Sequence, residues 1–165
     1  NSGSGNQGMT CSLPVLEYAK ELHTNEDKTY RALALSNLIA IHQKTGIGRL
    51  SAYCGAVSAG AAAGAGIAYL CGGGYEEVIH TVVNALAIVS GMVCDGAKAS
   101  CAAKIAASVD AGILGYNMYL QGQQFYAGDG IITKGIEGTI DNVGRLGKDG
   151  MKETNEEIIR IMIND

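Results

Sequence analysis

Residues 54–71 read CGAVSAGAAAGAGIAYLC and lie within an uncharged segment that extends from residue 50 to residue 75. Seven of the 26 residues in this segment are glycine and eight are alanine. The segment is long enough to cross a bilayer, but glycine and alanine drive membrane insertion only weakly. Small residues recur at every fourth position along one helix face: Ala56, Gly60, Gly64 and Ala68. A second helix can lie very close to such a face, so we predict a buried central helix with Cys54 in its first turn.

The composition of the whole chain agrees with close packing of helix backbones. Its 165 residues include 24 glycines, one proline, one phenylalanine and no tryptophan, and 47% of them are hydrophobic. A chain of this length and content can bury one core. No segment alternates apolar and polar residues as a half-buried strand would. We therefore predict an all-α fold, a compact multi-helix domain with buried central helices rich in glycine and alanine, over residues 1–165.

Charge and cysteine content argue against several classes of protein. Twelve basic and 16 acidic residues give a net charge of -4, without a long run of either sign, so nucleic acid is not an expected partner. The five cysteines are odd in number, and no secretory leader precedes them. We therefore expect a reducing, cytoplasmic location, no membrane association and no disulfide framework.

Apolar periodicity and capping residues predict further helices on both sides of the central one. Pro14 is expected in a first turn, so the first helix should begin near residue 12 or 13, after a loop formed by residues 1–8. The other helices are predicted over about residues 26–44, 75–92, 97–118 and 154–164. The chain begins at Asn1 rather than at a methionine, and we expect it to be the C-terminal fragment of a longer protein.

The loop of residues 1–8, NSGSGNQG, is the first candidate for binding a small anion. Its glycines permit a nest of backbone N–H groups that suits a carboxylate or a phosphate. A dinucleotide fingerprint is not supported, because no strand precedes these glycines. The alternative is a flexible terminus. The candidate residues are Asn1, Ser2, Gly3, Ser4, Gly5 and Asn6.

A second candidate anion site lies near the end of the helix predicted over residues 26–44. His42, Lys44 and Arg49 gather there, close in sequence to Cys54. Arg49 is the preferred carboxylate clamp, because its planar guanidinium matches the geometry of a carboxylate. The alternatives are a capping or core-edge histidine and two solvated cations.

Three cysteines are the candidate metal ligands. Cys94 and Cys101 bracket a short polar turn, and Cys54 lies forty positions before Cys94. Three thiolates that hold a cube of iron and sulfide leave one iron without a protein ligand, and that iron can act as a Lewis acid. The alternative is that the three thiols are small core residues.

The surroundings of these cysteines also carry information. The N-terminal end of the helix predicted over residues 97–118, together with Lys98, would favour the thiolate form of the nearby cysteines. Asp95 is expected to orient the turn. Cys11 and Cys71 are expected to serve packing rather than chemistry.

Three motifs together resemble one known family: residues 1–8 (NSGSGNQG), 32–60 (ALALSNLIAIHQKTGIGRLSAYCGAVSAG) and 91–101 (GMVCDGAKASC). The chain resembles the iron–sulfur-dependent L-serine dehydratase α-chain family over essentially its whole length. The closest branch is that of the bacterial L-cysteine desulfidase-like proteins. Serine dehydratases proper have a longer, proline-containing segment between the last two cluster ligands, whereas CDGAKASC is short and lacks proline.

The resemblance implies a site and a reaction. It implies a [4Fe-4S] cluster held by Cys54, Cys94 and Cys101, and a substrate carboxylate held by the loop of residues 1–8 and nearby cations. The implied activity is β-elimination from L-cysteine, which gives pyruvate, ammonia and sulfide without a pyridoxal cofactor. The family's N-terminal portion, which supplies the catalytic base, is absent from this sequence and is an expected partner, so the fragment alone is expected to be inactive.

Three alternatives stay open at this stage. The substrate can be L-serine, which would give pyruvate and ammonia. A domain of the same fold can bind a small acid or a cluster without turnover. A zinc-stabilised helical domain is a third reading, although CxxC pairs and an obvious fourth ligand are missing from the sequence. A homo-oligomer is compatible with each reading.

Overall fold

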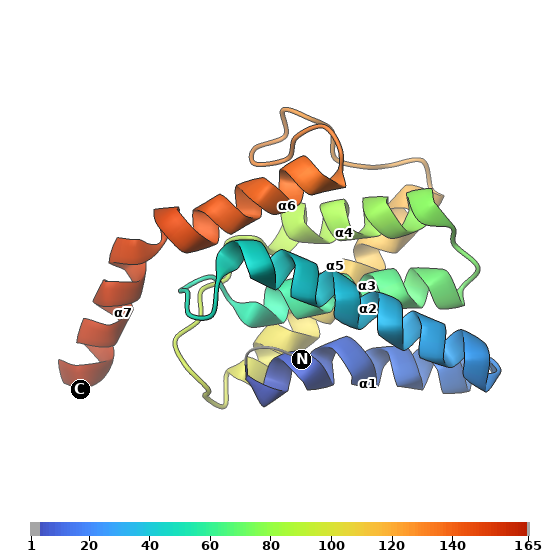
Figure 1. Ribbon diagram of the computed structural model, residues 1–165, viewed down its shortest axis with the longest axis horizontal. Coiled ribbons are helices and arrows are strands. Elements are labelled where there is room, and N and C mark those ends of the chain that lie inside the picture. The colour runs from blue at the N-terminus through green and yellow to red at the C-terminus, as the bar shows by residue number, and fades with distance from the viewer. Residues whose placement is uncertain (1–3, 165) are drawn as a thin grey trace.

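The computed structural model describes residues 4–164 of the chain. Within this range the chain forms seven α-helices and one π-helical turn (Figure 1): α1 (Gly5–Glu21), α2 (Glu26–Ile47), α3 (Gly55–Leu70), α4 (Tyr75–Val89), α5 (Cys101–Leu120), α6 (Ile136–Arg145), η1 (Leu146–Gly150) and α7 (Lys152–Asn164). The predicted all-α class is confirmed. Extended backbone pairs in the described range only at an isolated antiparallel β-bridge between Tyr53 and Val93.

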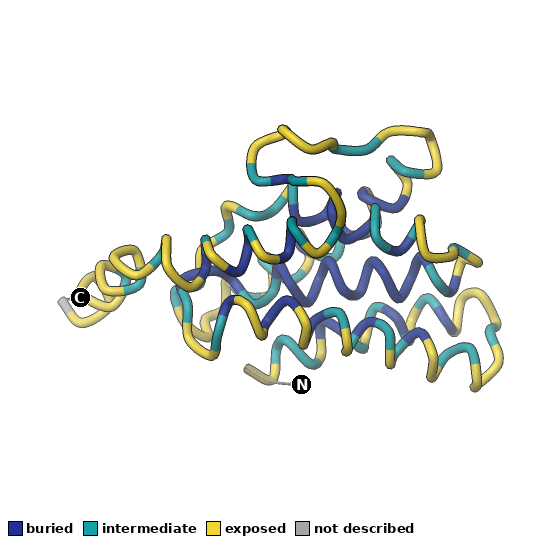
Figure 2. Tube along the Cα trace, turned by 45° about the horizontal axis from the view of Figure 1, so that its top comes forward, coloured by how far each residue is buried: buried dark blue, intermediate teal, exposed yellow. Residues whose placement is uncertain are grey.

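Helix α3 is the centre of the fold, as predicted. It packs against α1, α2, α4 and α5, and 13 of its 16 residues are buried. Figure 2 shows it as a continuous buried trace between helices that are exposed along their outer sides. Cys54 is the N-cap residue of this helix, one position before its first turn.

Glycines on α3 allow α5 to approach until the two backbones are in contact. A Cβ atom on Gly60 would lie 2.5 Å from the carbonyl carbon of Ser108, and one on Gly64 would lie 2.7 Å from Cα of Gly112. Cβ atoms do not come this close to backbone, so neither position accepts a larger residue unless the helices separate. The prediction that a second helix lies on the small-residue face is confirmed for these two glycines, and that helix is α5.

The first helix begins earlier than predicted. Helix α1 starts at Gly5 with Ser4 as its N-cap, so the prediction of a loop over residues 5–8 is wrong. The hydroxyl of Thr10 donates to the carbonyl of Asn6 at 2.7 Å and supports this added turn. The first three residues of the predicted loop lie outside the described residues.

Pro14 lies inside α1 rather than in its first turn. A proline in this position removes one hydrogen bond of the helix. The helix nevertheless continues, because Cys11, Val15 and Ala19 lie on its buried side and pack into the core. Most helical stability in proteins comes from such packing rather than from local preference. The expected packing role of Cys11 is confirmed, whereas the same expectation for Cys71 is wrong, because Cys71 follows the end of α3 and is exposed.

Three other helix ends differ from the prediction by a few residues. Helix α2 continues through Gly46, where a Cβ atom would lie 3.4 Å from Cα of Gly144 in α6, and stops at Gly48, whose φ of 93° suits glycine. Helix α4 ends slightly early, at Val89, and α5 begins slightly late, at Cys101. Residues 90–100, between the end of α4 and the start of α5, form the loop that carries Cys94.

Helix α7 leaves the helical bundle and forms an arm at one end of the molecule (Figure 1). It follows α6 through η1 and packs chiefly on η1. The predicted helix over residues 154–164 is confirmed. No helix in the described range is long and apolar enough to cross a membrane.

The contact of α3 with α5 can be tested with matched glycine-to-alanine substitutions. Gly64→Ala should lower the free energy of unfolding by about 1–3 kcal/mol, because the new Cβ overlaps the backbone of α5. Gly5→Ala adds the same atom where nothing lies within 4 Å and should leave stability equal or slightly higher. Urea unfolding followed by circular dichroism measures both, and equal midpoints would contradict the close packing.

Candidate functional site

Two segments far apart in the sequence are hydrogen-bonded to each other at one end of the bundle. The N–H of Cys94 donates to the carbonyl of Ala52 at 2.7 Å, and the N–H of Cys54 donates to the carbonyl of Met92 at 3.2 Å. These two bonds flank the isolated β-bridge. The bridge thus brings the backbones of Cys54 and Cys94 together, a pairing that sequence reasoning did not predict.

A cavity of about 400 Å³ lies next to this bridge. It is formed by the N-terminal ends of α1, α3 and α5 and by the C-terminal end of α2 with the loop that follows it. Helix N-terminal ends carry partial positive charge, so three of them favour anions in the cavity. The lining residues are Ser4, Asn6, Gln7, Lys44, Arg49, Leu50, Ser51, Tyr53, Cys54, Gly55, Ala56, Cys94, Gly96, Ala97, Cys101, Lys104 and Ile105.

The structure places most of the candidate site residues in this one cavity. The exceptions are Gly5, which begins α1 without lining the cavity, residues 1–3, which lie outside the described residues, and His42. His42 Nε2 lies 2.7 Å from Oε2 of Glu137 on α6, and both side chains are largely exposed. Residues two positions apart on a helix point in different directions, so His42 turns away from the cavity that Lys44 enters. The candidates that line the cavity are Ser4, Asn6, Lys44, Arg49, Cys54, Cys94 and Cys101.

Cys54 is buried at the start of α3. Burial raises the pKa of its thiol, and the neighbouring Cys94 adds to this effect. The N–H groups of Ala56 and Val57 and the ammonium of Lys104 lower the pKa. Burial therefore favours the protonated thiol, while positive groups nearby can stabilise the thiolate that a metal requires.

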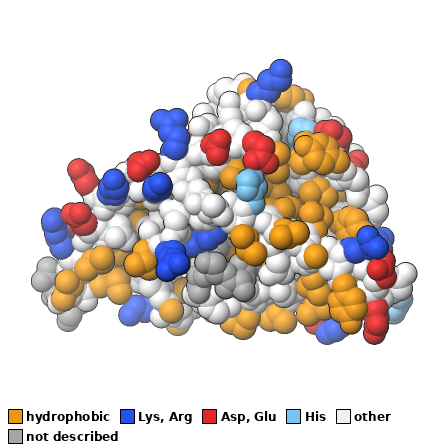
Figure 3. Space-filling model, in the orientation of Figure 1, with side chains coloured by type: hydrophobic (Ala, Val, Ile, Leu, Met, Phe, Trp, Pro, Cys, Tyr) orange, Lys and Arg blue, Asp and Glu red, His pale blue; other side chains and the backbone are white. Residues whose placement is uncertain are grey.

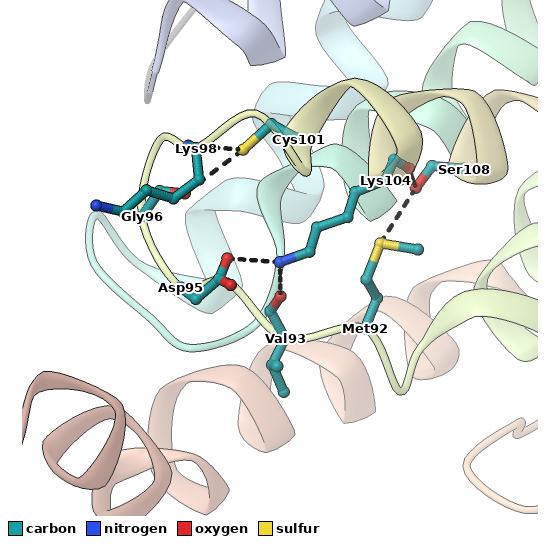
Figure 4. Close-up of polar contacts among 8 residues, drawn as sticks. All are labelled: Met92, Val93, Asp95, Gly96, Lys98, Cys101, Lys104 and Ser108. Atoms are coloured by element: carbon teal, nitrogen blue, oxygen red, sulfur yellow. Dashed lines mark hydrogen bonds and ion pairs between the residues drawn. The ribbon is translucent and has the colours of Figure 1, made fainter. Parts of the chain in front are cut away.

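Cys101 is the first residue of α5. The helix predicted over residues 97–118 placed it about one turn inside, so that prediction is wrong. Its Sγ donates to the carbonyl of Gly96 and accepts from the N–H of Lys98, both at 3.4 Å (Figure 4). The loop therefore folds back onto the thiol of Cys101. Cys94, in contrast, is held through its backbone.

Lys44 is the buried cation of the cavity. Lys44 is only 8% exposed, although a lysine considered alone is expected in solvent. Burial lowers the pKa of its ammonium, and Cys94 and Cys54 raise it, so Lys44 lies within electrostatic reach of both thiols. Arg49 lines the same cavity but is exposed. Among the predicted carboxylate ligands, Lys44 is therefore interior to the cavity and Arg49 is peripheral.

Lys104 is a cavity residue that sequence reasoning missed. Its Nζ donates to Oδ1 of Asp95 at 2.5 Å and to the carbonyl of Val93 at 3.0 Å (Figure 4). The hydrogen bond between Lys104 and Asp95 raises the pKa of Lys104 and lowers the pKa of Asp95. Asp95 thus orients the turn, as predicted. A signal was available, because Lys104 follows Cys101 by three positions and shares its helix face.

The three thiols do not converge on a single point. Among the described residues, no group of three or more histidine, cysteine, aspartate or glutamate side chains is placed to hold one metal ion. A structural zinc ion needs four ligands around one point, so this part of the chain offers it no site. An iron–sulfur cube does not require its thiolates to meet at one point, because each thiolate binds an iron at a different corner.

Charged side chains are mixed on the face drawn in Figure 3. Lysine and arginine side chains alternate there with acidic ones, and the described residues on this face form no continuous basic surface. In the described range, Lys20 pairs with Glu17 and Arg31 pairs with Asp27, each along a single helix.

Comparison with known proteins identifies relatives over the whole chain. A family model described as the serine dehydratase alpha chain matches residues 1–160. A UPF0597 protein of Desulfitobacterium hafniense is 72% identical over 99% of this chain and 38% of its own length. UPF0597 proteins of Lachnoclostridium phytofermentans and Treponema denticola are 61% and 53% identical, over 39% and 38% of their lengths. The chain thus spans about two fifths of these curated relatives. No solved structure matches it.

Replacing Lys44 with methionine should stabilise the metal-free chain at neutral pH by on the order of 1 kcal/mol, because methionine avoids the cost of burying an ammonium. The gain should shrink as pH rises toward 10.5, the ordinary lysine value. Burial lowers the pKa in the folded state, so the unfolded chain binds more protons in this range and the unsubstituted chain becomes more stable with pH.

Urea unfolding at several pH values measures this effect. The control is Lys20→Met, because Lys20 is exposed and its replacement should change stability by no more than about 0.5 kcal/mol. Destabilisation by Lys44→Met at neutral pH would show that the buried ammonium is better stabilised than the structure indicates.

Proposed function

The chain belongs to the serine dehydratase alpha chain family, and from this premise we propose that it is the cluster-binding part of an iron–sulfur-dependent lyase that acts on a small L-amino acid. The proposal rests on one observation: Cys54, Cys94 and Cys101 line a single cavity together with Lys44 and Arg49. Thiols suit an iron–sulfur cluster, and cations suit the carboxylate of an amino acid.

The donor set fits a [4Fe-4S] cluster in kind and number. Cys54, Cys94 and Cys101 would hold it. Lys104 and the N–H groups of Ala56 and Val57 lower the pKa of the Cys54 thiol, against the larger effect of burial. When bound through three thiolates, such a cluster supplies one iron without a protein ligand, a Lewis acid that can stabilise negative charge on a leaving group. A fully cysteine-ligated cluster would leave no iron free.

The cations and the start of α1 are the proposed substrate contacts. Arg49 can clamp a carboxylate with two parallel hydrogen bonds, while Lys44 acts as a point charge inside the cavity. Ser4 and Asn6 line the same cavity and offer hydrogen-bonding groups to the substrate. The proposal extends to Asn1, Ser2 and Gly3, which directly precede them in sequence.

The proposed reaction is β-elimination. A base removes the α-proton of L-cysteine, the bond between the β-carbon and sulfur breaks, and sulfide leaves with the electron pair. The remaining aminoacrylate hydrolyses to pyruvate and ammonia. With L-serine the same steps release water in place of sulfide. We favour L-cysteine because the segment from Cys94 to Cys101 is short and lacks proline.

The rest of the machinery is proposed to lie outside this chain. The coverage of its relatives supports this, since the chain spans 38% of the Desulfitobacterium hafniense protein. We propose that the catalytic base belongs to the remaining part of a longer protein, and that this protein works in a reducing compartment such as the cytoplasm, where thiolate ligands persist.

The test is anaerobic reconstitution of the full-length protein with iron and sulfide, followed by parallel assays on L-cysteine and L-serine. We expect sulfide and pyruvate in equal amounts from L-cysteine, because one bond to sulfur breaks for each aminoacrylate formed. Pyruvate from L-serine alone would assign the dehydratase reaction instead. A cluster without turnover of either amino acid would contradict the lyase and leave a binding role.

The same assay tests the carboxylate clamp. Arg49→Ala should raise KM at least tenfold, because a charge-assisted hydrogen bond contributes about 1.5–3 kcal/mol. The control is Arg31→Ala, because Arg31 is exposed and pairs with Asp27 on its own helix. An unchanged KM for the Arg49 variant would remove this residue from the site.

Single cysteine substitutions test the ligand set without relying on activity. Cys54→Ala, Cys94→Ala and Cys101→Ala should each prevent recovery of the cluster, measured as iron per chain and by visible absorption. Cys71→Ala should retain the iron content of the unsubstituted protein, because Cys71 is exposed and does not line the cavity. Equal losses from all four substitutions would contradict the assignment.

A further inference from the structure

We propose that Lys104 is a positioning residue that fixes the loop between Cys94 and Cys101 to helix α5, and that it thereby sets how these two thiols are presented to a cluster. The inference rests on the proposed function, because it assigns the role of Lys104 toward the same cavity. The hydrogen bonds of Lys104 to both neighbours of Cys94 carry it.

The loop contains little regular structure of its own. After the bridge residue Val93, the chain passes through turns and bends until α5 begins at Cys101. Lys104 reaches back from the first turn of α5 and donates to the carbonyl of Val93 and to the carboxylate of Asp95 (Figure 4). Its two acceptors stand directly before and after Cys94. One ammonium therefore ties both neighbours of Cys94 to the helix that starts with Cys101.

Helix α5, to which Lys104 ties the loop, is itself held in place by α3. Gly60 of α3 lies against the backbone of Ser108, one helical turn after Lys104. The hydroxyl of Ser108 donates to the carbonyl of Lys104 at 2.7 Å and lies 3.9 Å from the sulfur of Met92. Met92 precedes Val93, so α5 contacts the loop at two successive points. The contact of α3 with α5 thus fixes the backbone position of Lys104, and the side chain of Lys104 fixes the loop relative to it.

The ion pair between Lys104 and Asp95 is partly shielded from solvent. The Lys104 side chain is 19% exposed, and that of Asp95 is 46% exposed. Lys98, in the same loop, provides a contrast, because it is exposed and its ammonium points away from the loop in Figure 4. The two lysines carry the same charge close to the same cysteines, and of their two side chains only that of Lys104 ties the loop to α5.

The experiment compares Lys104→Met with Lys98→Met and uses Lys104→Arg as a rescue. Amide hydrogen exchange of residues 94–100 in the metal-free protein should become about tenfold faster in Lys104→Met, which corresponds to about 1.4 kcal/mol. Lys98→Met should match the unsubstituted protein, and Lys104→Arg should recover most of the protection because arginine can donate to both acceptors. Amides of α3 should exchange at the same rate in all variants.

The second readout is the cluster itself. After anaerobic reconstitution, Lys104→Met should bind less iron per chain than Lys98→Met, and the electron paramagnetic resonance signal of its reduced cluster should differ in shape. Unchanged loop exchange in Lys104→Met, or iron content and signal equal to those of Lys98→Met, would overturn the proposal. Faster exchange in α3 as well would also overturn it, since the effect would then be general destabilisation.

These outcomes separate this proposal from the proposed function. If the unsubstituted protein binds no cluster, the proposed function fails, and with it the role of Lys104 toward a cluster. If the unsubstituted protein binds a cluster and Lys104→Met binds it equally well, the proposed function stands and the positioning role of Lys104 is rejected.

Discussion

The direct contact between the backbones of α3 and α5 is the constraint on which the rest of the structure depends. Gly60 and Gly64 face Ser108 and Gly112 so closely that no side chain fits between them. A contact of this kind is stabilised by dispersion between many closely packed atoms. It tolerates little change, because packed interiors respond to the addition of a single carbon atom. The relative position of the two helices is therefore tightly determined.

The same contact places the groups that carry the candidate chemistry. Cys54 caps α3 and Cys101 opens α5, so fixing the two helices also places the backbones of two of the three cysteines. Cys94 joins them through its hydrogen bond to Ala52, and Lys104 ties the intervening loop to α5. The helix N-terminal ends around the cavity add positive potential. Packing thus brings the cysteines to one cavity, and the positive potential there favours a small anion.

The cavity region also contains groups that lower stability. Lys44 is buried beside the thiols, and the hydroxyl of Tyr53 is buried without a hydrogen-bond partner in the part of the chain that the structure describes. Burial raises the pKa of Tyr53 and lowers that of Lys44. A charge or hydroxyl held in this way costs free energy. Such costs occur at sites that a protein uses, where local rules of stability are set aside.

From its local periodicity and residue sizes, the sequence alone predicted the all-α class, the buried central helix and the face on which another helix lies. It also singled out the three cysteines by type and spacing. Three features could not be predicted from it: α5 fills the face at Gly60, Lys44 points inward while His42 turns outward, and Lys104 holds the loop at Cys94. These features depend on distances and side-chain directions between segments far apart in the chain, and packing sets them only when the helices come together.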